Sequence, residues 1–162
     1  LNREVPGAGT ATLYTDYQCP YCRKMHPVLD ALMREDNKVR LVYRDWPIFG
    51  AASTEAARAA IAAKYQGKHA EFNAALMQTD GRLSSQSIRA AADRAGVDWN
   101  RLQADLDQHG SEIGQALGRT SRFAAMAGLS GTPGLMVGPY LLPGAVDLAT
   151  LRQAVALARE GE

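Results

Sequence analysis

The stretch DYQCPYCRKMHP at residues 16–27 decides how this chain is read, because it holds the only two cysteines of a 162-residue protein. Cys19 and Cys22 are separated by Pro20 and Tyr21. Cysteines at this spacing are typical of half a metal site, of haem attachment or of a redox-active dithiol. A purely structural disulfide is a poor explanation, because so small a loop removes little entropy from the unfolded chain. The surrounding sequence has to decide among the three chemistries.

The segments around the pair predict a strand, a helix and a second strand. Residues 10–15 and 38–46 show partial alternation of apolar and polar side chains, which is typical of strands. Residues 20–35 carry apolar side chains at helical spacing, and Pro20 suits a first helical turn. This order predicts a parallel strand pair with a right-handed crossover. The cysteines would then lie where the first strand ends and its helix begins, the edge at which α/β sheets usually place their chemistry.

The rest of the chain predicts a helical block and then a return to the sheet. Residues 53–129 are rich in alanine and contain four or five amphipathic segments, the first expected to begin with a capping box at Ser53 or Thr54. Residues 131–145 predict a β-hairpin, and residues 147–160 a final helix. The block is too long for a loop, so we expect it to form a subdomain inserted into an α/β sheet.

Other conspicuous side chains are expected to serve packing or the surface. Trp46 is expected to pack between the sheet and the helical block, Arg23 and Lys24 to be solvated, and His26 to lie on the helix surface. Apolar residues expected to face the core are Phe72, Met77, Phe123, Met126 and Leu157. None of these positions predicts a cofactor site.

The charge balance indicates no nucleic-acid or membrane partner. The net charge is +1, with 18 basic and 17 acidic side chains spread along the chain, so no polybasic face is expected. The longest apolar runs, such as residues 123–129, are too short to cross a bilayer. The chain starts at Leu1 without a signal peptide or an initiator methionine, which indicates a processed or trimmed protein.

The predicted position of the cysteines favours redox chemistry. A helix N-terminus stabilises a thiolate, so the pKa of Cys19 should be depressed, at about 1.4 kcal/mol for each pKa unit. That energy stabilises the reduced form, which makes the disulfide a stronger oxidant. Cys22, one turn further along the helix, should be shielded and act as the resolving thiol.

The two rival chemistries fit less well. Haem attachment requires a histidine directly after the second cysteine, where Arg23 stands. A zinc site wants four ligands, and Cys19, Cys22 and His26 supply three. The other histidines, at positions 69 and 109, lie far away in the helical block. We therefore expect no metal site.

Three segments together resemble the DsbA family of thioredoxin-like disulfide oxidoreductases: TLYTDYQCPYC, VRLVYRDWPIFG and GTPGLMVG…LLPGA. The resemblance covers about residues 10–160 and includes the helical insertion, which the shorter glutaredoxins lack. It implies one thioredoxin-like domain over residues 1–162, with a thioredoxin core at 10–50 and 130–160. The inserted helical subdomain would occupy about residues 53–129.

The resemblance also implies roles for individual residues. Cys19 and Cys22 would be the catalytic pair, with Pro20 and Tyr21 as the active-site dipeptide. Thr132–Pro133 would be a cis peptide bond in a loop that faces the dithiol and binds substrate as an added strand. No cofactor beyond the Cys19–Cys22 disulfide is implied.

Two positions depart from the family pattern. Leu13 stands where thioredoxin-like folds commonly bury a carboxylate, six residues before the first cysteine, so proton transfer at Cys22 must use water or another group. Gly134 stands where a small polar or bulkier residue is more usual, and could loosen the substrate groove.

We therefore expect a thiol–disulfide oxidoreductase that oxidises dithiols of secreted or envelope proteins in a bacterial periplasm or cell envelope. A separate redox partner would regenerate its disulfide. Within the same fold, a reductase, an isomerase or a copper-stress protection protein stays open, since suppressor-of-copper-sensitivity proteins also resemble this sequence. A non-catalytic peptide- or metal-binding module is a further alternative. Only about nine residues precede the first strand, and no sustained heptads follow, so we expect a monomer.

Overall fold

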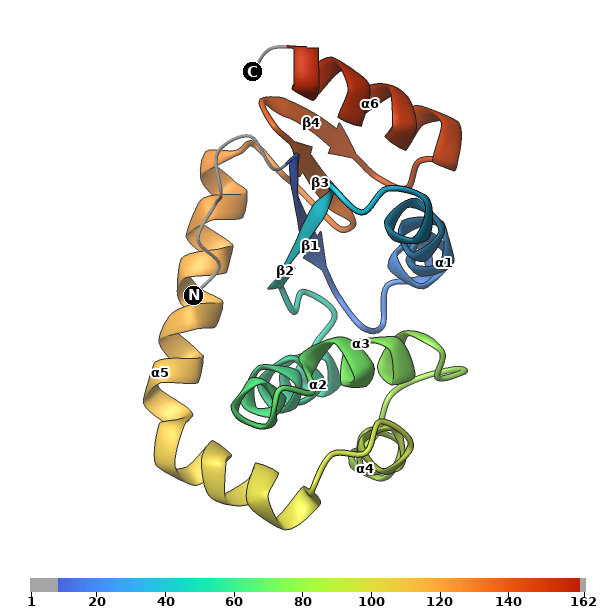
Figure 1. Ribbon diagram of the computed structural model, residues 1–162. Coiled ribbons are helices and arrows are strands. Elements are labelled where there is room, and N and C mark those ends of the chain that lie inside the picture. The colour runs from blue at the N-terminus through green and yellow to red at the C-terminus, as the bar shows by residue number, and fades with distance from the viewer. Residues whose placement is uncertain (1–8, 161–162) are drawn as a thin grey trace.

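The computed structural model describes residues 9–160, which form a thioredoxin-like fold with a four-stranded mixed sheet (Figure 1). The ends of the expected domain, residues 1–8 and 161–162, lie outside the described residues. The elements in chain order are β1 (Thr10–Thr15), α1 (Pro20–Glu35), β2 (Arg40–Asp45), α2 (Ala51–Ala62), the 3₁₀ turn η1 (Ala63–Gln66), α3 (His69–Met77), α4 (Ser85–Arg94), α5 (Trp99–Met126), β3 (Gly134–Val137), β4 (Tyr140–Pro143) and α6 (Leu148–Glu160).

The sheet has the order β2-β1-β3-β4, so β1 is a central strand. It pairs with β2 in parallel and with β3 antiparallel, and β3 pairs antiparallel with β4 across the turn at Gly138 and Pro139. The expected strands, crossover helix and hairpin are therefore confirmed. In the antiparallel register Tyr14 lies opposite Gly134, which brings the start of β3 to the end of β1.

The two faces of the sheet are covered by different helices. On one face Ala11 and Leu13 of β1 pack with Met25 of α1 and Leu151 of α6. On the other face Tyr14 packs with Ala124 near the end of α5, and Trp46 lies against this cluster as expected. Figure 1 shows α1 and α6 together on one side of the sheet and the long α5 on the other.

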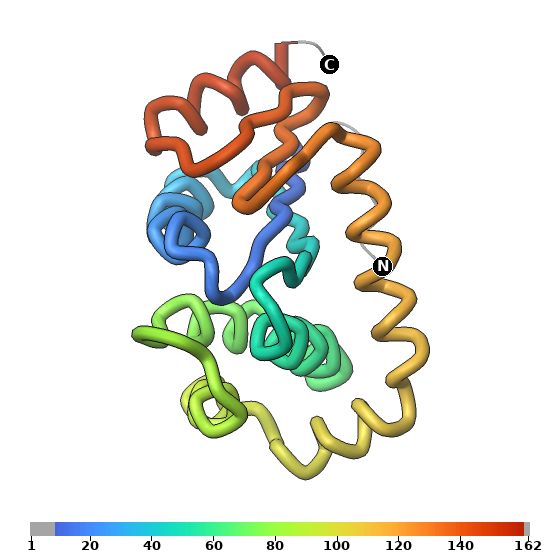
Figure 2. Tube along the Cα trace, turned by 180° about the vertical axis from the view of Figure 1, so that it is seen from behind, coloured from blue at the N-terminus to red at the C-terminus, as the bar shows by residue number. Residues whose placement is uncertain are grey.

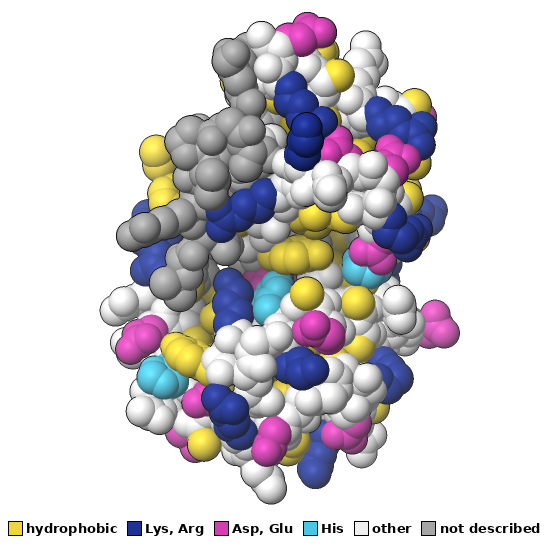
Figure 3. All heavy atoms as spheres, in the orientation of Figure 1, with side chains coloured by type: hydrophobic (Ala, Val, Ile, Leu, Met, Phe, Trp, Pro, Cys, Tyr) yellow, Lys and Arg dark blue, Asp and Glu magenta, His cyan; other side chains and the backbone are white. Residues whose placement is uncertain are grey.

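Helices α2 to α5 form the insertion at the end of the sheet where β1 stops. Its core is filled by alanines and by Phe72, Ile88, Leu102 and Ile113, and it is continuous with Cys22 at the start of α1. Figure 2 shows the β1–α1 loop facing these helices, and α5 returning from them to the sheet. Hydrophobic side chains are visible at the junction of the two parts on the face drawn in Figure 3. No helix within residues 9–160 is both long and apolar enough to cross a membrane.

The first helix of the insertion begins differently from the sequence prediction. Helix α2 begins at Ala51 after Gly50, whose φ is 96°, and no side chain caps it, so the capping box expected at Ser53 or Thr54 was wrong. Ser53 lies inside the first turn of α2 and is buried, and its hydroxyl donates to the Asp16 carboxylate just after β1. A capping box exists instead at the start of α4, where Ser84 and Ser87 cap each other's amides.

Three apolar residues expected in the core are exposed. Phe123 is 42% exposed, Met126 82% and Leu157 41%, whereas Phe72 and Met77 are buried as expected. In α5 the small Ala124 makes the buried contact with Tyr14, and Phe123 lies outside it with the Arg44 guanidinium 5.5 Å from its ring centroid. In α6 the buried contact is made by Leu151 and Val155, and Leu157 lies outside it.

Candidate active site

The two cysteines lie where β1 ends and α1 begins. Cys19 is the N-cap of α1, its sulfur accepts a hydrogen bond from the Cys22 amide at 3.4 Å, and Pro20 occupies the first turn. The Cys19 amide donates to the Asp16 carbonyl at 3.2 Å, which closes a tight turn before the helix. Both cysteines are free thiols and both are buried, Cys22 one turn into the helix.

The loop before β3 completes the site. The Thr132–Pro133 peptide bond is cis, and Cys19, when protonated, donates to the Thr132 carbonyl at 3.4 Å. Tyr21 instead points outward and is 60% exposed, with the Lys24 ammonium 5.6 Å from its ring centroid. The fold thus brings Cys19, Cys22 and Thr132 together and leaves Tyr21 on the rim.

The surroundings of Cys19 favour its thiolate. Its pKa is lowered from about 9 to about 6, chiefly by the hydrogen bond from the Cys22 thiol, then by the Thr132 hydroxyl and by the Cys22 and Tyr21 amides, while burial opposes the shift. The helix N-terminus acts in the same direction as these donors. The Cys22 thiol and the Thr132 hydroxyl therefore lower the Cys19 pKa together with the helix N-terminus. The sequence had indicated only the helix N-terminus.

The pKa of Cys22 is shifted in the opposite direction. It is raised above the usual range of a thiol, first because the Cys22 thiol donates to Cys19 and then because it is buried. The Asp16 backbone and the hydroxyls of Thr132 and Thr15 act against this rise. When the pair carries a single negative charge, that charge is therefore on the Cys19 sulfur, and Cys22 remains a thiol.

Asp16 holds the loops around the site. Its buried carboxylate accepts from the amide of Gln18 at 2.7 Å, from that of Ile48 at 2.8 Å and from that of Phe49 at 3.2 Å. It also accepts from the Ser53 hydroxyl at 2.9 Å. Asp16 thus ties the β1–α1 loop to the β2–α2 loop and to the start of α2.

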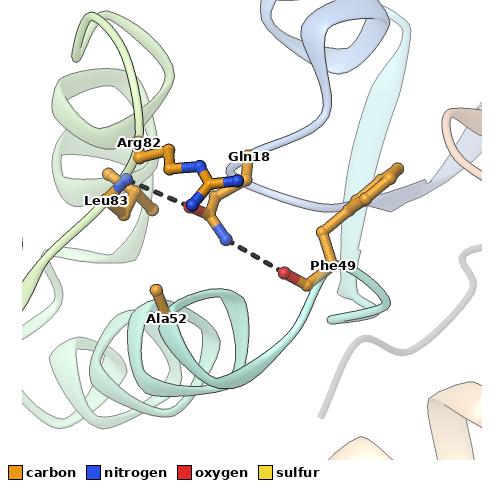
Figure 4. Close-up of a pocket in the computed structure, with 5 residues that line it drawn as sticks. All are labelled: Gln18, Phe49, Ala52, Arg82 and Leu83. Atoms are coloured by element: carbon orange, nitrogen blue, oxygen red, sulfur yellow. Dashed lines mark hydrogen bonds between the residues drawn. The ribbon is translucent and has the colours of Figure 1, made fainter.

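Gln18, directly before Cys19, connects three segments around a pocket of about 410 Å³ (Figure 4). Its amide nitrogen donates to the Phe49 carbonyl at 3.2 Å, and its amide oxygen accepts from the Leu83 amide at 3.0 Å. Ala52 and Arg82 complete the lining. Phe49 faces Gln18 with its carbonyl, whereas its 51% exposed side chain points away from the other lining residues (Figure 4).

A buried polar chain lies under the site. The Tyr17 hydroxyl donates to Asp45 at 2.8 Å, Asp45 is 2.8 Å from His69, and Asn73 donates to the Tyr17 oxygen at 3.3 Å. Burial raises the pKa of Tyr17 well above its ordinary value, so Tyr17 stays a neutral donor. His69 and Asn73 belong to α3, whereas Asp45 ends β2 and Tyr17 lies two residues before Cys19. These hydrogen bonds therefore connect the insertion to the sheet and to the loop that carries Cys19.

Two expectations about polar residues were wrong. Arg23 is not a solvated charge, since it donates to the Tyr17 carbonyl at 2.9 Å and to the Gly81 carbonyl at 2.8 Å. His26 is buried rather than on the helix surface, with Asp30 3.4 Å away. Among residues 9–160, no three His, Cys, Asp or Glu side chains are grouped so as to hold a metal ion.

Comparison with known proteins gives the family. The model of the DSBA-like thioredoxin domain matches residues 10–156. The chain belongs to this family. A thioredoxin-like oxidoreductase from Silicibacter pomeroyi is 38% identical and superimposes with a TM-score of 0.89 over 93% of this chain and 86% of that one. The thiol-disulfide exchange protein alpha-DsbA2 from Wolbachia pipientis is 28% identical, with a TM-score of 0.88 over 92% of this chain and 81% of that one.

The curated relatives of this DSBA-like domain are much longer proteins. The Na(+)/H(+) antiporter NhaA 1 of Salinispora arenicola is 29% identical over 161 residues, which is 98% of this chain and 24% of that protein. NhaA 3 of Salinispora tropica is 30% identical over 159 residues, with 94% and 23% covered. The chain therefore spans about a quarter of the length of the curated relatives that it matches.

Sequence reasoning missed the residues that support the dithiol. Asp16 and Gln18 stand in the quoted motif, and an aspartate just after a strand is a signal for a loop-capping carboxylate. Asp45, His69 and Asn73 offered no such signal, because only the fold brings them together.

Proposed function

We propose that this domain is a thiol–disulfide oxidoreductase that oxidises dithiols of secreted or envelope proteins. The observation that carries the proposal is the contrast between the two thiols, with a Cys19 pKa of about 6 and a Cys22 pKa raised above the usual range. A stabilised thiolate favours the reduced pair, so the Cys19–Cys22 disulfide gives up its bond readily and is a strong oxidant.

The exchange would take two steps at Cys19. A substrate thiolate attacks the Cys19 sulfur of the disulfide, the Cys19–Cys22 bond breaks, and its electron pair leaves on Cys22. A second substrate thiolate then attacks the substrate sulfur of the mixed disulfide, and Cys19 leaves as the stabilised thiolate. The substrate gains a disulfide, the domain is left as a dithiol, and a separate electron acceptor restores it.

The surroundings of Cys19 support a peptide substrate. An extended segment can add as a strand along the backbone at Thr132, beside the cis Pro133. Tyr21, between the two cysteines, and Phe49, whose carbonyl accepts from Gln18, are exposed and would offer apolar contact to the residues that flank a substrate cysteine.

Location and assembly are part of the proposal. The solved relatives include a periplasmic thioredoxin-like protein from Salmonella enterica, 26% identical with a TM-score of 0.83, and an oxidising compartment suits a strong oxidant. We propose the same kind of compartment and a monomeric domain, which light scattering would test. The proposal does not include the antiporter activity of the curated relatives, because this chain matches only 24% of the length of the NhaA 1 protein of Salinispora arenicola.

The test is oxidation of a reduced peptide dithiol by the purified disulfide form. We expect fast, stoichiometric oxidation by the wild-type disulfide and its loss in Cys19→Ser. The reduced Cys22→Ser protein, mixed with a single-cysteine peptide whose sulfur carries thionitrobenzoate, should release thionitrobenzoate and keep the peptide as a stable mixed disulfide on Cys19. Equilibration with glutathione measures the potential: a value near about −120 mV supports the oxidant, and about −200 mV or lower supports a reductase or isomerase.

A further inference from the structure

Thr15 is the last residue of β1 and faces the helix that carries the dithiol. Alternate residues of a strand share a face, so Thr15 lies on the same side of β1 as Ala11 and Leu13, which pack against α1. On that face Thr15 is the next residue after Leu13 and the last before the loop to α1, in whose first turn Cys22 is buried. Its backbone is held in the sheet, with its carbonyl accepting from the Trp46 amide at 2.8 Å.

The Thr15 side chain is a buried polar group that its surroundings leave unused. Thr15 is 1% exposed, and its hydroxyl oxygen makes no hydrogen bond of normal geometry with any residue that the structure describes. A buried hydroxyl without a partner destabilises a fold, and an isosteric apolar side chain at this position would avoid that cost. The hydroxyl is therefore poorly explained by packing alone.

Its neighbour is the inner thiol. The Thr15 hydroxyl acts on Cys22, where it lowers the pKa against the larger effects of Cys19 and burial, and it has no such effect on Cys19. The Thr132 hydroxyl, in the loop before β3, acts on both sulfurs. The two hydroxyls can therefore be distinguished by experiment.

We propose that Thr15 is a catalytic residue whose hydroxyl donates a hydrogen bond to the Cys22 sulfur when that sulfur carries the negative charge. The inference deepens, and rests on, the proposed function. As a substrate thiolate attacks Cys19, the Cys19–Cys22 bond breaks and the electron pair moves to Cys22, which leaves as a thiolate in a buried place. The Thr15 O–H then finds the acceptor that it lacks in the dithiol form. The Cys22 thiolate afterwards takes up a proton, and the hydroxyl of Thr15 is unchanged.

The experiment compares the disulfide forms of the wild type, Thr15→Val, Thr15→Ser and Thr12→Val in their reaction with reduced glutathione, followed by stopped flow. Thr15→Val should react about tenfold more slowly, the loss expected for one hydrogen bond to a charged group. Thr15→Ser should restore most of the rate. Thr12→Val is the matched control, because Thr12 lies on the same strand but faces away from α1.

Two further readouts separate catalysis from structure. The ultraviolet absorbance of the thiolate should show Cys19 titrating near pH 6 in Thr15→Val as in the wild type, whereas Thr132→Val should shift that titration upward. In a Cys19→Ser background, alkylation of Cys22 at fixed pH should be about tenfold slower with Thr15→Val. The melting temperature of Thr15→Val should be equal to or above that of the wild type.

Each outcome bears on the proposal. A wild-type rate for Thr15→Val, an equally slow Thr15→Ser, or a Thr15→Val protein that unfolds would overturn the catalytic role and leave the oxidoreductase intact. If the wild-type disulfide itself does not react with glutathione, the proposed function and this inference both fail.

Discussion

Replacing Cys22 by alanine should raise the pKa of Cys19, since the hydrogen bond from the Cys22 thiol is the largest cause of its depression from about 9 to about 6. At pH 7 a thiol with a pKa of about 6 is roughly 90% ionised, and one with a pKa of about 9 roughly 1%. The Thr132 hydroxyl and the helix amides remain in Cys22→Ala, so we expect a rise of about one to two units rather than full recovery.

The assay is the rate of Cys19 alkylation by iodoacetamide between pH 4 and 10, followed by mass spectrometry. A rise from about 6 to about 7 lowers the thiolate fraction at pH 6 from roughly 50% to roughly 10%, so alkylation at that pH should slow about fivefold. Cys22→Ser is the matched control, because its hydroxyl can still donate to Cys19. A Cys22→Ala protein that titrates near pH 6, or a wild type that titrates near pH 9, would refute the hydrogen-bond explanation.

The same pKa predicts how the stability of the dithiol form depends on pH. Because the folded pKa of Cys19 is depressed, its contribution is fully present above the unfolded value of about 9 and is lost as the pH falls through about 6. The disulfide form has no such thiolate. The melting temperature of the dithiol form relative to the disulfide form should therefore rise between pH 6 and pH 9, and a flat difference would contradict the assignment.

Three further substitutions test the rest of the site. Phe49→Ala should raise KM for a peptide dithiol by about three- to tenfold, the usual loss for an apolar anchor, and leave the reaction with glutathione unchanged; an unchanged KM would remove Phe49 from the substrate surface. Asp16→Ala should lower the free energy of unfolding in urea by about 3 kcal/mol, because three partly buried amides and the buried Ser53 hydroxyl lose their acceptor, whereas the exposed Asp80→Ala should change it by less than about 0.5 kcal/mol. Gly134→Ala should cost about 1–3 kcal/mol in the same experiment, because an added Cβ would come within 2.6 Å of Leu129; full stability would show that Leu129 moves aside at little cost.

The sequence alone was enough to predict the order of strands and helices and the place of the dithiol. Strand alternation, helical spacing and Pro20 at a helix start are local patterns, and local backbone preferences fix what they predict. The spacing of Cys19 and Cys22 likewise needs only one helical turn to bring the two residues together.

The tertiary structure alone decided how the dithiol is supported. Asp16, Asp45 and His69 become partners of other groups only when the sheet and the insertion pack together, and hydrogen bonds between distant segments leave no periodic trace in a sequence. Met126 shows the same limit for apolar residues, because the packing surface opposite each helix position decides which side chains are buried. Thr15 is a polar residue in a strand, and nothing in the local sequence shows that its hydroxyl is buried without a partner near Cys22.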